Sequence, residues 1–97
     1  MRAWFYMLRL RSGGLYVGAT RDMAKRWRDH KDGFACRTTK HDPPVALVHQ
    51  EICATYKDAC AREAQVKRWS RAKKEALAAG STELLRALAV SHDHSGE

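Results

Sequence analysis

The sequence predicts an α+β domain in which helices flank a small three-stranded, antiparallel-type sheet, in the order β-β-α-β-α-α. Two observations favour this class. The first half of the chain has short runs of aromatic and large apolar residues around a glycine turn, and the second half has runs of good helix formers behind capping residues. Three strands covered by helices can be stable alone, whereas a lone hairpin would not be.

The first two elements predict a β-hairpin. Trp4–Leu10 and Leu15–Ala19 have strand composition, and the turn signal Arg11–Gly14 separates them. If the last three residues of this turn form the loop, Tyr6 and Tyr16 lie on the same face of the sheet. A two-residue loop would place the two tyrosines on opposite faces.

The middle of the chain predicts one helix, a loop and a third strand. Thr20 or Asp22 can cap a helix that runs to about His30. Residues 31–44 contain a glycine and a proline pair and predict a loop, after which Val45–Ile52 predicts a strand with side chains alternating between two faces.

The remaining elements are predicted to be helical. Thr55 opens a helix to about Trp69, and Ser70 caps another that Gly80 ends. A last helix is expected over 83–90. We therefore expect a single domain over residues 1–90 and a flexible tail over 91–97.

Composition indicates a folded protein with a polyanionic partner. Hydrophobic residues make up 44% of the 97, which excludes a disordered chain, and 18 Lys plus Arg against 11 Asp plus Glu give a net charge of +7. Nucleic acid is the commonest partner of such a charge. No apolar stretch approaches the length of a membrane span and no signal peptide is recognisable, so we expect a cytoplasmic protein with no membrane partner.

The first predicted helix carries a mixed apolar and cationic face. Arg26 and His30 are four residues apart and share this face with Met23 and Trp27. One interpretation is an amphipathic helix whose arginine packs its stem and reaches solvent. The other is a guanidinium held in place to bind a phosphate.

Two further positions have both a structural and a functional interpretation. Glu63 lies on the more apolar side of its predicted helix, with Lys67 one turn on. Such a carboxylate either pairs with a basic neighbour or binds a hard cation. Gly18 either ends its strand or allows a close approach of backbone or substrate.

The segment around Trp69 is strongly basic. Charge runs are usually solvated faces, but a dense run beside an aromatic residue is also typical of nucleic-acid contacts. The candidate nucleic-acid-binding residues are Lys67, Arg68, Arg71, Lys73 and Lys74.

Four features of the sequence occur in the order in which the GIY-YIG nuclease superfamily has them, and each resembles its counterpart there. Leu15-Tyr16-Val17-Gly18 is similar to the second signature, and Phe5-Tyr6-Met7, ten residues upstream, lies where the first belongs. Arg26 follows Tyr16 by ten residues, as the helix arginine of that family does. Trp69–Leu77 looks like the end of the small single-domain bacterial members called the YhbQ-like or UPF0213 group.

The resemblance implies cleavage of phosphodiester bonds with one divalent metal, Mg²⁺ or Mn²⁺. The family's metal ligand aligns with Glu63 and its phosphate-binding arginine with Arg26. Its two tyrosines align with Tyr6 and Tyr16, and either could be the base. The residue that orients a tyrosine or relays its proton aligns with His30.

We therefore expect a metal-dependent DNA endonuclease that acts in DNA repair or processing. Its substrate selection would be either weak or supplied by a protein partner. The alternatives are a nucleic-acid-binding module with little or no catalysis, and a protein-interaction domain on the same scaffold. The sequence leaves the oligomeric state open.

Overall fold

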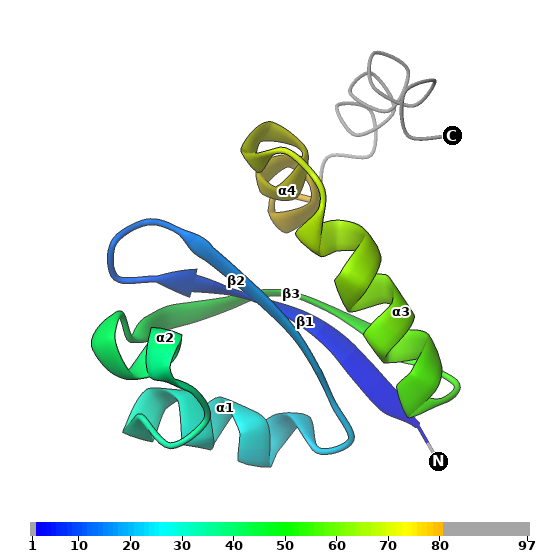
Figure 1. Cartoon of the computed structure of the whole chain (residues 1–97), viewed down its shortest axis with the longest axis horizontal. Coiled ribbons are helices and arrows are strands. Elements are labelled where there is room, and N and C mark those ends of the chain that lie inside the picture. Colours follow the sequence, from blue (N-terminus) through cyan, green and yellow to red (C-terminus); the bar gives the residue numbers. More distant parts are fainter. Residues whose placement is uncertain (1, 81–97) are drawn as a thin grey trace.

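The computed structural model describes residues 2–80. Its three antiparallel strands lie in the order β2-β1-β3, with β1 over Ala3–Leu10, β2 over Leu15–Thr20 and β3 over Pro44–Cys53. The helices are α1 (Met23–Asp32), α2 (Arg37–His41), α3 (Tyr56–Lys67) and α4 (Arg71–Ala78). Figure 1 shows the α1–α2 pair on one side of the strands and the α3–α4 pair on the other. The predicted α+β class is confirmed.

The predicted domain boundaries depend on residues that the structure does not describe. The helix expected over 83–90 and the tail expected over 91–97 lie outside the described residues, so these boundaries stay a prediction. Within residues 2–80, the helices are too short and too polar to span a membrane.

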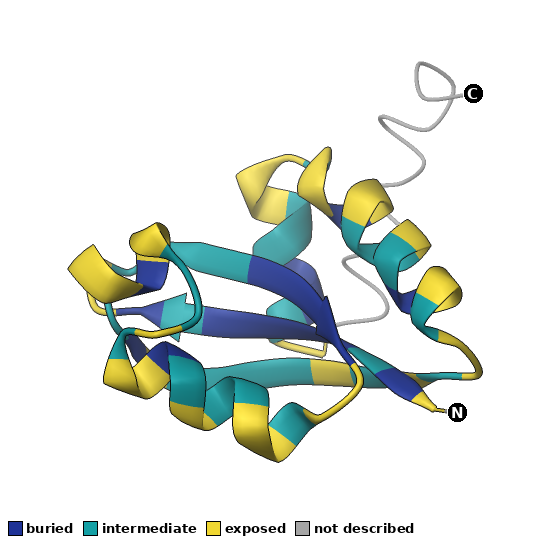
Figure 2. Cartoon of the chain, turned by 60° about the horizontal axis from the view of Figure 1, so that its bottom comes forward, coloured by how far each residue is buried: buried dark blue, intermediate teal, exposed yellow. Residues whose placement is uncertain are grey.

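The central strand β1 contributes to cores on both faces of the sheet, because successive side chains of a strand point in opposite directions. On one face, Phe5 and Met7 pack with Val66 of α3 and Leu77 of α4. The other face carries a second core formed by β1 side chains, with residues of β2, β3 and α1 packed against it: Tyr6, Leu8, Leu10, Tyr16, Met23, Trp27 and Leu47. In Figure 2 the buried positions accordingly concentrate on the strands.

The hairpin loop lies one residue earlier than expected. Leu10 and Gly14 are joined by a backbone hydrogen bond of 2.9 Å, so the loop is Arg11-Ser12-Gly13. Gly13 has a φ of 95°, which is the left-handed conformation that ends such a three-residue loop. The structure therefore has the three-residue alternative, and Tyr6 and Tyr16 lie on the same face.

Two expectations for the middle of the chain are wrong. Residues 31–44 were expected to be a loop, but Arg37–His41 forms the short helix α2. This segment has no apolar periodicity to predict a helix, and it is held by the burial of Thr39 against α1. In β3, the expected alternation fails because the register shifts between Met7 and Leu8: Leu47 packs on the Tyr6 face, whereas His49 packs against Phe5.

The helix starts agree with the capping residues. Asp22, rather than Thr20, accepts a hydrogen bond from the backbone of Lys25 at the start of α1. Thr55 and Ser70 do the same for α3 and α4. These caps satisfy backbone donors that a helix start leaves without an internal partner.

Candidate active site

Tyr6 crosses the neighbouring strand at Gly18. The two residues are paired in the β1–β2 register, and the ring of Tyr6 lies so close that a Cβ at position 18 would be 2.5 Å from Tyr6 Cζ. This contact carries the phenol towards α1, where Tyr6 Oη is 2.8 Å from His30 Nε2. Tyr6 is only 2% exposed. Gly18 is therefore required for the close approach of a side chain.

His30 contacts Tyr6, Tyr16 and Thr39 at the same time. It is 1% exposed, and both ring nitrogens are engaged: Nε2 with Tyr6 and Nδ1 with Thr39 Oγ1, each at 2.8 Å. Its ring also makes an edge contact with Tyr16 at a centroid distance of 5.2 Å. Burial, and next the charge of Arg26, lower the pKa of His30 to about 4. The imidazole is therefore neutral at neutral pH.

The two tyrosines differ in their access to solvent. Tyr16 is half-buried, whereas Tyr6 is buried and its hydroxyl is engaged with His30. Burial, and next a hydrogen bond with the Cys36 side chain, raise the pKa of Tyr16 to about 12. Burial likewise raises the pKa of Tyr6, and the nearby Tyr16 adds to the effect. Both phenols are protonated at neutral pH unless additional positive charge is brought close.

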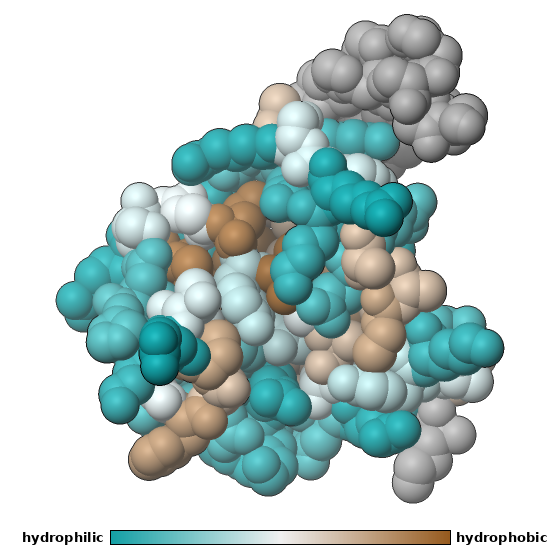
Figure 3. Space-filling view, viewed as in Figure 1, coloured by the Kyte–Doolittle hydropathy of each residue, from teal (hydrophilic) through white to brown (hydrophobic). Residues whose placement is uncertain are grey.

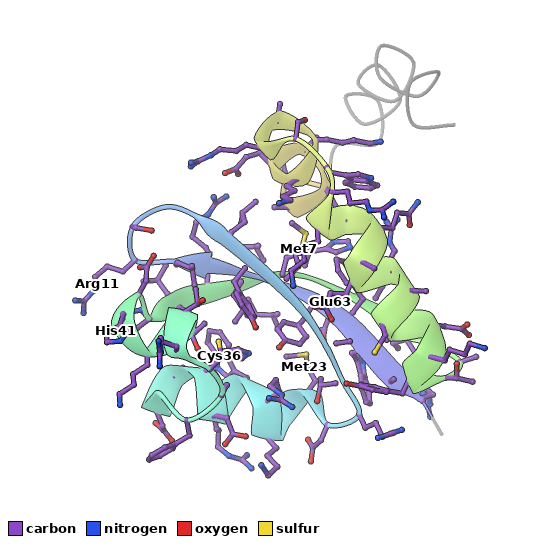
Figure 4. The ribbon with its side chains drawn as sticks, viewed as in Figure 1. Met7, Arg11, Met23, Cys36, His41 and Glu63 are labelled. Carbon is purple, nitrogen blue, oxygen red and sulfur yellow. The ribbon has the colours of Figure 1, made fainter. Side chains whose placement is uncertain are left out.

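A cationic and an anionic side chain approach these phenols from different helices. The charge of Arg26 on α1 lowers the pKa of both tyrosines, and the charge of Glu63 on α3 raises both, so each charge lies near both rings. In Figure 4, Glu63 points from α3 towards the middle of the molecule, and Cys36 points there from the start of α2. The fold thus brings the five predicted site residues together: Tyr6, Tyr16, Arg26, His30 and Glu63.

Sequence reasoning missed two residues beside this cluster. Thr39 and Cys36 lie in the segment expected to be a loop, yet Thr39 is fully buried against His30 and its hydroxyl is 3.3 Å from Cys36 Sγ. No periodicity or motif in that segment marks Thr39 as buried. The only local signal is its position three residues after Cys36, which is the N-cap of α2.

Glu63 is the side chain of this cluster that could hold a metal ion. Within residues 2–80, no group of three His, Cys, Asp or Glu side chains could hold a metal ion. The Glu63 side chain is 27% exposed, and its Oε2 is 3.4 Å from Lys67 Nζ. It fits a magnesium-type site in which one carboxylate shares the coordination shell with waters and a substrate phosphate. Binding of metal without substrate should be weak.

Of the predicted basic residues, Lys67, Arg68 and Arg71 are exposed, whereas Lys73 and Lys74 are half-buried. Lys73 Nζ lies 4.3 Å from the ring centroid of Trp69, and Arg71 donates to the carbonyl of Gly13 at 3.2 Å. Arg71 and Lys74 line a cavity of about 190 Å³ with Leu15. Figure 3 shows hydrophilic side chains over most of this face, with apolar atoms between the hairpin and α4.

The acidic residue of the same segment is tied to the sheet. Glu75 makes two hydrogen bonds of 2.6 Å with Arg9, so it joins α4 to β1. Trp69 is half-buried, and Arg62 and Lys73 both lie close to its ring. Trp69 therefore contributes to packing in this structure.

The cluster is thus built by a hairpin that carries two tyrosines, a helix with arginine and histidine, and a later helix with a single glutamate. Residues 2–76 match the model of the GIY-YIG catalytic domain. The chain belongs to the GIY-YIG family.

Several of its relatives carry the designation UPF0213. A UPF0213 protein of Bacillus pumilus is 38% identical over 72 residues, which are 74% of each chain. Another, from Haloquadratum walsbyi, is 35% identical over 81 residues, which cover 84% of this chain and 91% of the relative. The solution NMR structure of the UPF0213 protein BH0048 from Bacillus halodurans superposes with a TM-score of 0.54 at 28% identity, covering 94% of this chain and 98% of that one.

Proposed function

We propose that this protein is a divalent-metal-dependent endonuclease that hydrolyses phosphodiester bonds of nucleic acid, with DNA as the expected substrate in repair or processing. One observation carries the proposal: two phenols lie on one sheet face, and the charges of both the Arg26 guanidinium and the Glu63 carboxylate act on both of them. Such a site can bind a phosphate, hold a cation and accept a proton within a single cluster.

Arg26 is proposed to bind the scissile phosphate. It is partly exposed on α1 and lies close enough to His30 to lower the pKa of the imidazole. A guanidinium presents paired donors that match phosphate oxygens, and it keeps its charge at every relevant pH. It would therefore hold the phosphate beside the two tyrosines.

Tyr16 is the better candidate for the base that accepts a proton from the attacking water. It is half-buried, whereas the hydroxyl of Tyr6 is enclosed and bonded to His30. The raised pKa of Tyr16 has to fall before its phenolate is populated, and Arg26 already acts in that direction. In this scheme Tyr6 and His30 support Tyr16 from the buried side.

Glu63 is proposed to hold Mg²⁺ or Mn²⁺. A divalent cation bound there would stabilise negative charge on the phosphate oxygens as a Lewis acid. The ion pair between Glu63 and Lys67 is long at 3.4 Å and solvent-accessible, so it opposes metal binding only weakly.

The test is a cleavage assay on labelled single-stranded, duplex and branched DNA, with single-stranded RNA for comparison, in Mg²⁺, Mn²⁺ or EDTA. Glu63→Gln keeps the side-chain shape and removes the charge, and it should lower metal-dependent cleavage by about 100-fold or more. Asp58→Asn removes one charge from the exposed first turn of the same helix and is the matched control.

Equal cleavage by wild type and Glu63→Gln would overturn the metal assignment. Cleavage in EDTA would overturn the metal dependence. Nucleic-acid binding without cleavage in either metal would overturn the nuclease and favour the alternative of a binding module.

A further inference from the structure

Thr39 occupies an unusual place for a threonine in a five-residue surface helix. It is fully buried, and its Oγ1 lies 2.8 Å from His30 Nδ1, on the side of the ring opposite Tyr6. We propose that Thr39 is a positioning residue that holds His30 in the tautomer with the proton on Nδ1, so that Nε2 accepts the hydrogen bond of the Tyr6 hydroxyl. The catalytic consequence rests on the proposed function, whereas the tautomer itself does not.

The hydrogen-bond inventory favours this direction. A neutral histidine donates from one ring nitrogen and accepts at the other. If Tyr6 donates to Nε2, then Nδ1 donates to Thr39, and the threonine hydroxyl needs an acceptor. Cys36 provides two: its carbonyl oxygen lies 3.5 Å from Thr39 Oγ1 and its Sγ lies at 3.3 Å. Every donor in the series of hydrogen bonds from Tyr6 through His30 and Thr39 to Cys36 then has an acceptor.

The opposite direction leaves one donor without an acceptor. Thr39 would donate to Nδ1, and Nε2 would donate to Tyr6 Oη. The hydrogen of the Tyr6 hydroxyl would then need a second acceptor, and His30 is the only hydrogen-bond partner of Tyr6 Oη within residues 2–80. A buried hydroxyl hydrogen left without a partner destabilises the folded protein.

A neutral hydroxyl is suited to this task because it orients the imidazole without adding charge. A carboxylate in the place of Thr39 would favour the imidazolium, which can only donate. Burial and the charge of Arg26 oppose protonation of His30, and Asp29 on the same helix acts the other way. With Thr39 as its partner, His30 stays neutral and keeps a lone pair directed at Tyr6.

The threonine methyl group has a separate role. Thr39 has no exposed surface, and β-branching restricts its χ1 rotamer. Serine at this position would keep the hydroxyl and lose packing, and valine would keep the packing and lose the hydroxyl. These two substitutions separate orientation of His30 from simple stability.

The experiment measures the imidazole ¹⁵N chemical shifts of His30 by NMR in the full-length protein. In wild type, Nδ1 should show the shift of a protonated nitrogen and Nε2 that of an acceptor. Thr39→Val should change this pattern towards the other tautomer, and Thr39→Ser should retain it. Thr38→Val, at the exposed neighbouring threonine, is the matched control and should leave the pattern unchanged.

In the cleavage assay, Thr39→Val should lower kcat by about 10- to 100-fold with little change in KM, by analogy with groups that orient metal-bound histidines. Thr39→Ser should recover most of that loss. A packing role alone would give the opposite result, with a loss in Thr39→Ser and little loss in Thr39→Val.

A proton on Nε2 in wild type, or the wild-type pattern in folded Thr39→Val, would overturn the proposal. If Thr39→Val does not fold, the wild-type shifts and Thr39→Ser still decide it, because loss of the pattern with the hydroxyl retained would also count against it. Absence of cleavage by wild type would overturn the proposed function and leave the tautomer result standing.

Discussion

The ring of Tyr6 lies over the backbone of Gly18, directly across the β1–β2 pair. This contact is what allows a tyrosine of the central strand to pass over its neighbour and reach His30 on α1. A larger residue at position 18 would occupy the path of the phenol. Gly18, which lies two residues after Tyr16 in β2, therefore makes room for the ring of Tyr6.

Gly18→Ala should lower the free energy of unfolding by about 1–3 kcal/mol, because the added methyl overpacks a buried contact. It should also break the bond between Tyr6 and His30, which His30 NMR shifts would report. Gly14→Ala is the control: its Cβ would meet only Ser12 Oγ at 3.5 Å, so denaturation should be little changed. Equal stability of the two variants in urea would contradict the packing argument.

Arg26→Ala should reduce turnover by about 100- to 1000-fold, because the transition state would lose a charged donor to the phosphate. The unfolding free energy should change little, since Arg26 is partly exposed. Single-turnover cleavage beside Arg28→Ala, an exposed arginine of the same helix, provides the measurement. A wild-type rate for Arg26→Ala would remove this residue from the site.

His30 should make stability depend on pH in the acidic range. Its pKa is about 4 in the folded protein, below the usual value of about 6.5. As pH falls through this interval, the unfolded chain binds a proton that the folded protein does not, so stability is lost by at most about 1.4 kcal/mol per pH unit.

Urea denaturation between pH 4 and pH 7.5 would test this effect. The difference in unfolding free energy between wild type and His30→Gln should shrink as pH falls, whereas the exposed His41→Gln should give a curve parallel to wild type. Parallel curves for His30→Gln would show that His30 titrates normally.

Reversing the charges of Lys73 and Lys74 to glutamate should weaken DNA binding and flatten its salt dependence. Each lost phosphate contact lowers the slope of log K against log salt by about 0.9. Reversal of Arg2 and Lys57, two exposed basic residues outside the predicted run, gives the same change in net charge. An unchanged slope for the Lys73 and Lys74 variant would move the binding surface elsewhere.

Much of the fold could be predicted because its signals are local. Asp22, Thr55 and Ser70 cap helices through hydrogen bonds to backbone groups within three residues. The hairpin follows from a turn between two apolar runs. The misplaced loop still gave the correct face for Tyr6 and Tyr16, because only the parity of the loop length enters that inference.

The sequence predicted which residues form the candidate site, and these residues do lie together. Their individual roles stay predictions. Motif spacing indicates which residues belong to the set. It says nothing of burial, and burial is what separates Tyr6 from Tyr16 as a candidate base.

The sequence by itself determined the order of the strands and longer helices, the helix starts and the excess of positive charge, and it left the face of the two tyrosines to the loop length. Each depends on neighbours a few residues apart or on simple counts. The tertiary structure decided that α2 forms, that Tyr6 passes over Gly18, and that Thr39 meets His30. These contacts join residues that meet only after the strands pair and the helices pack on the sheet, so no local pattern encodes them.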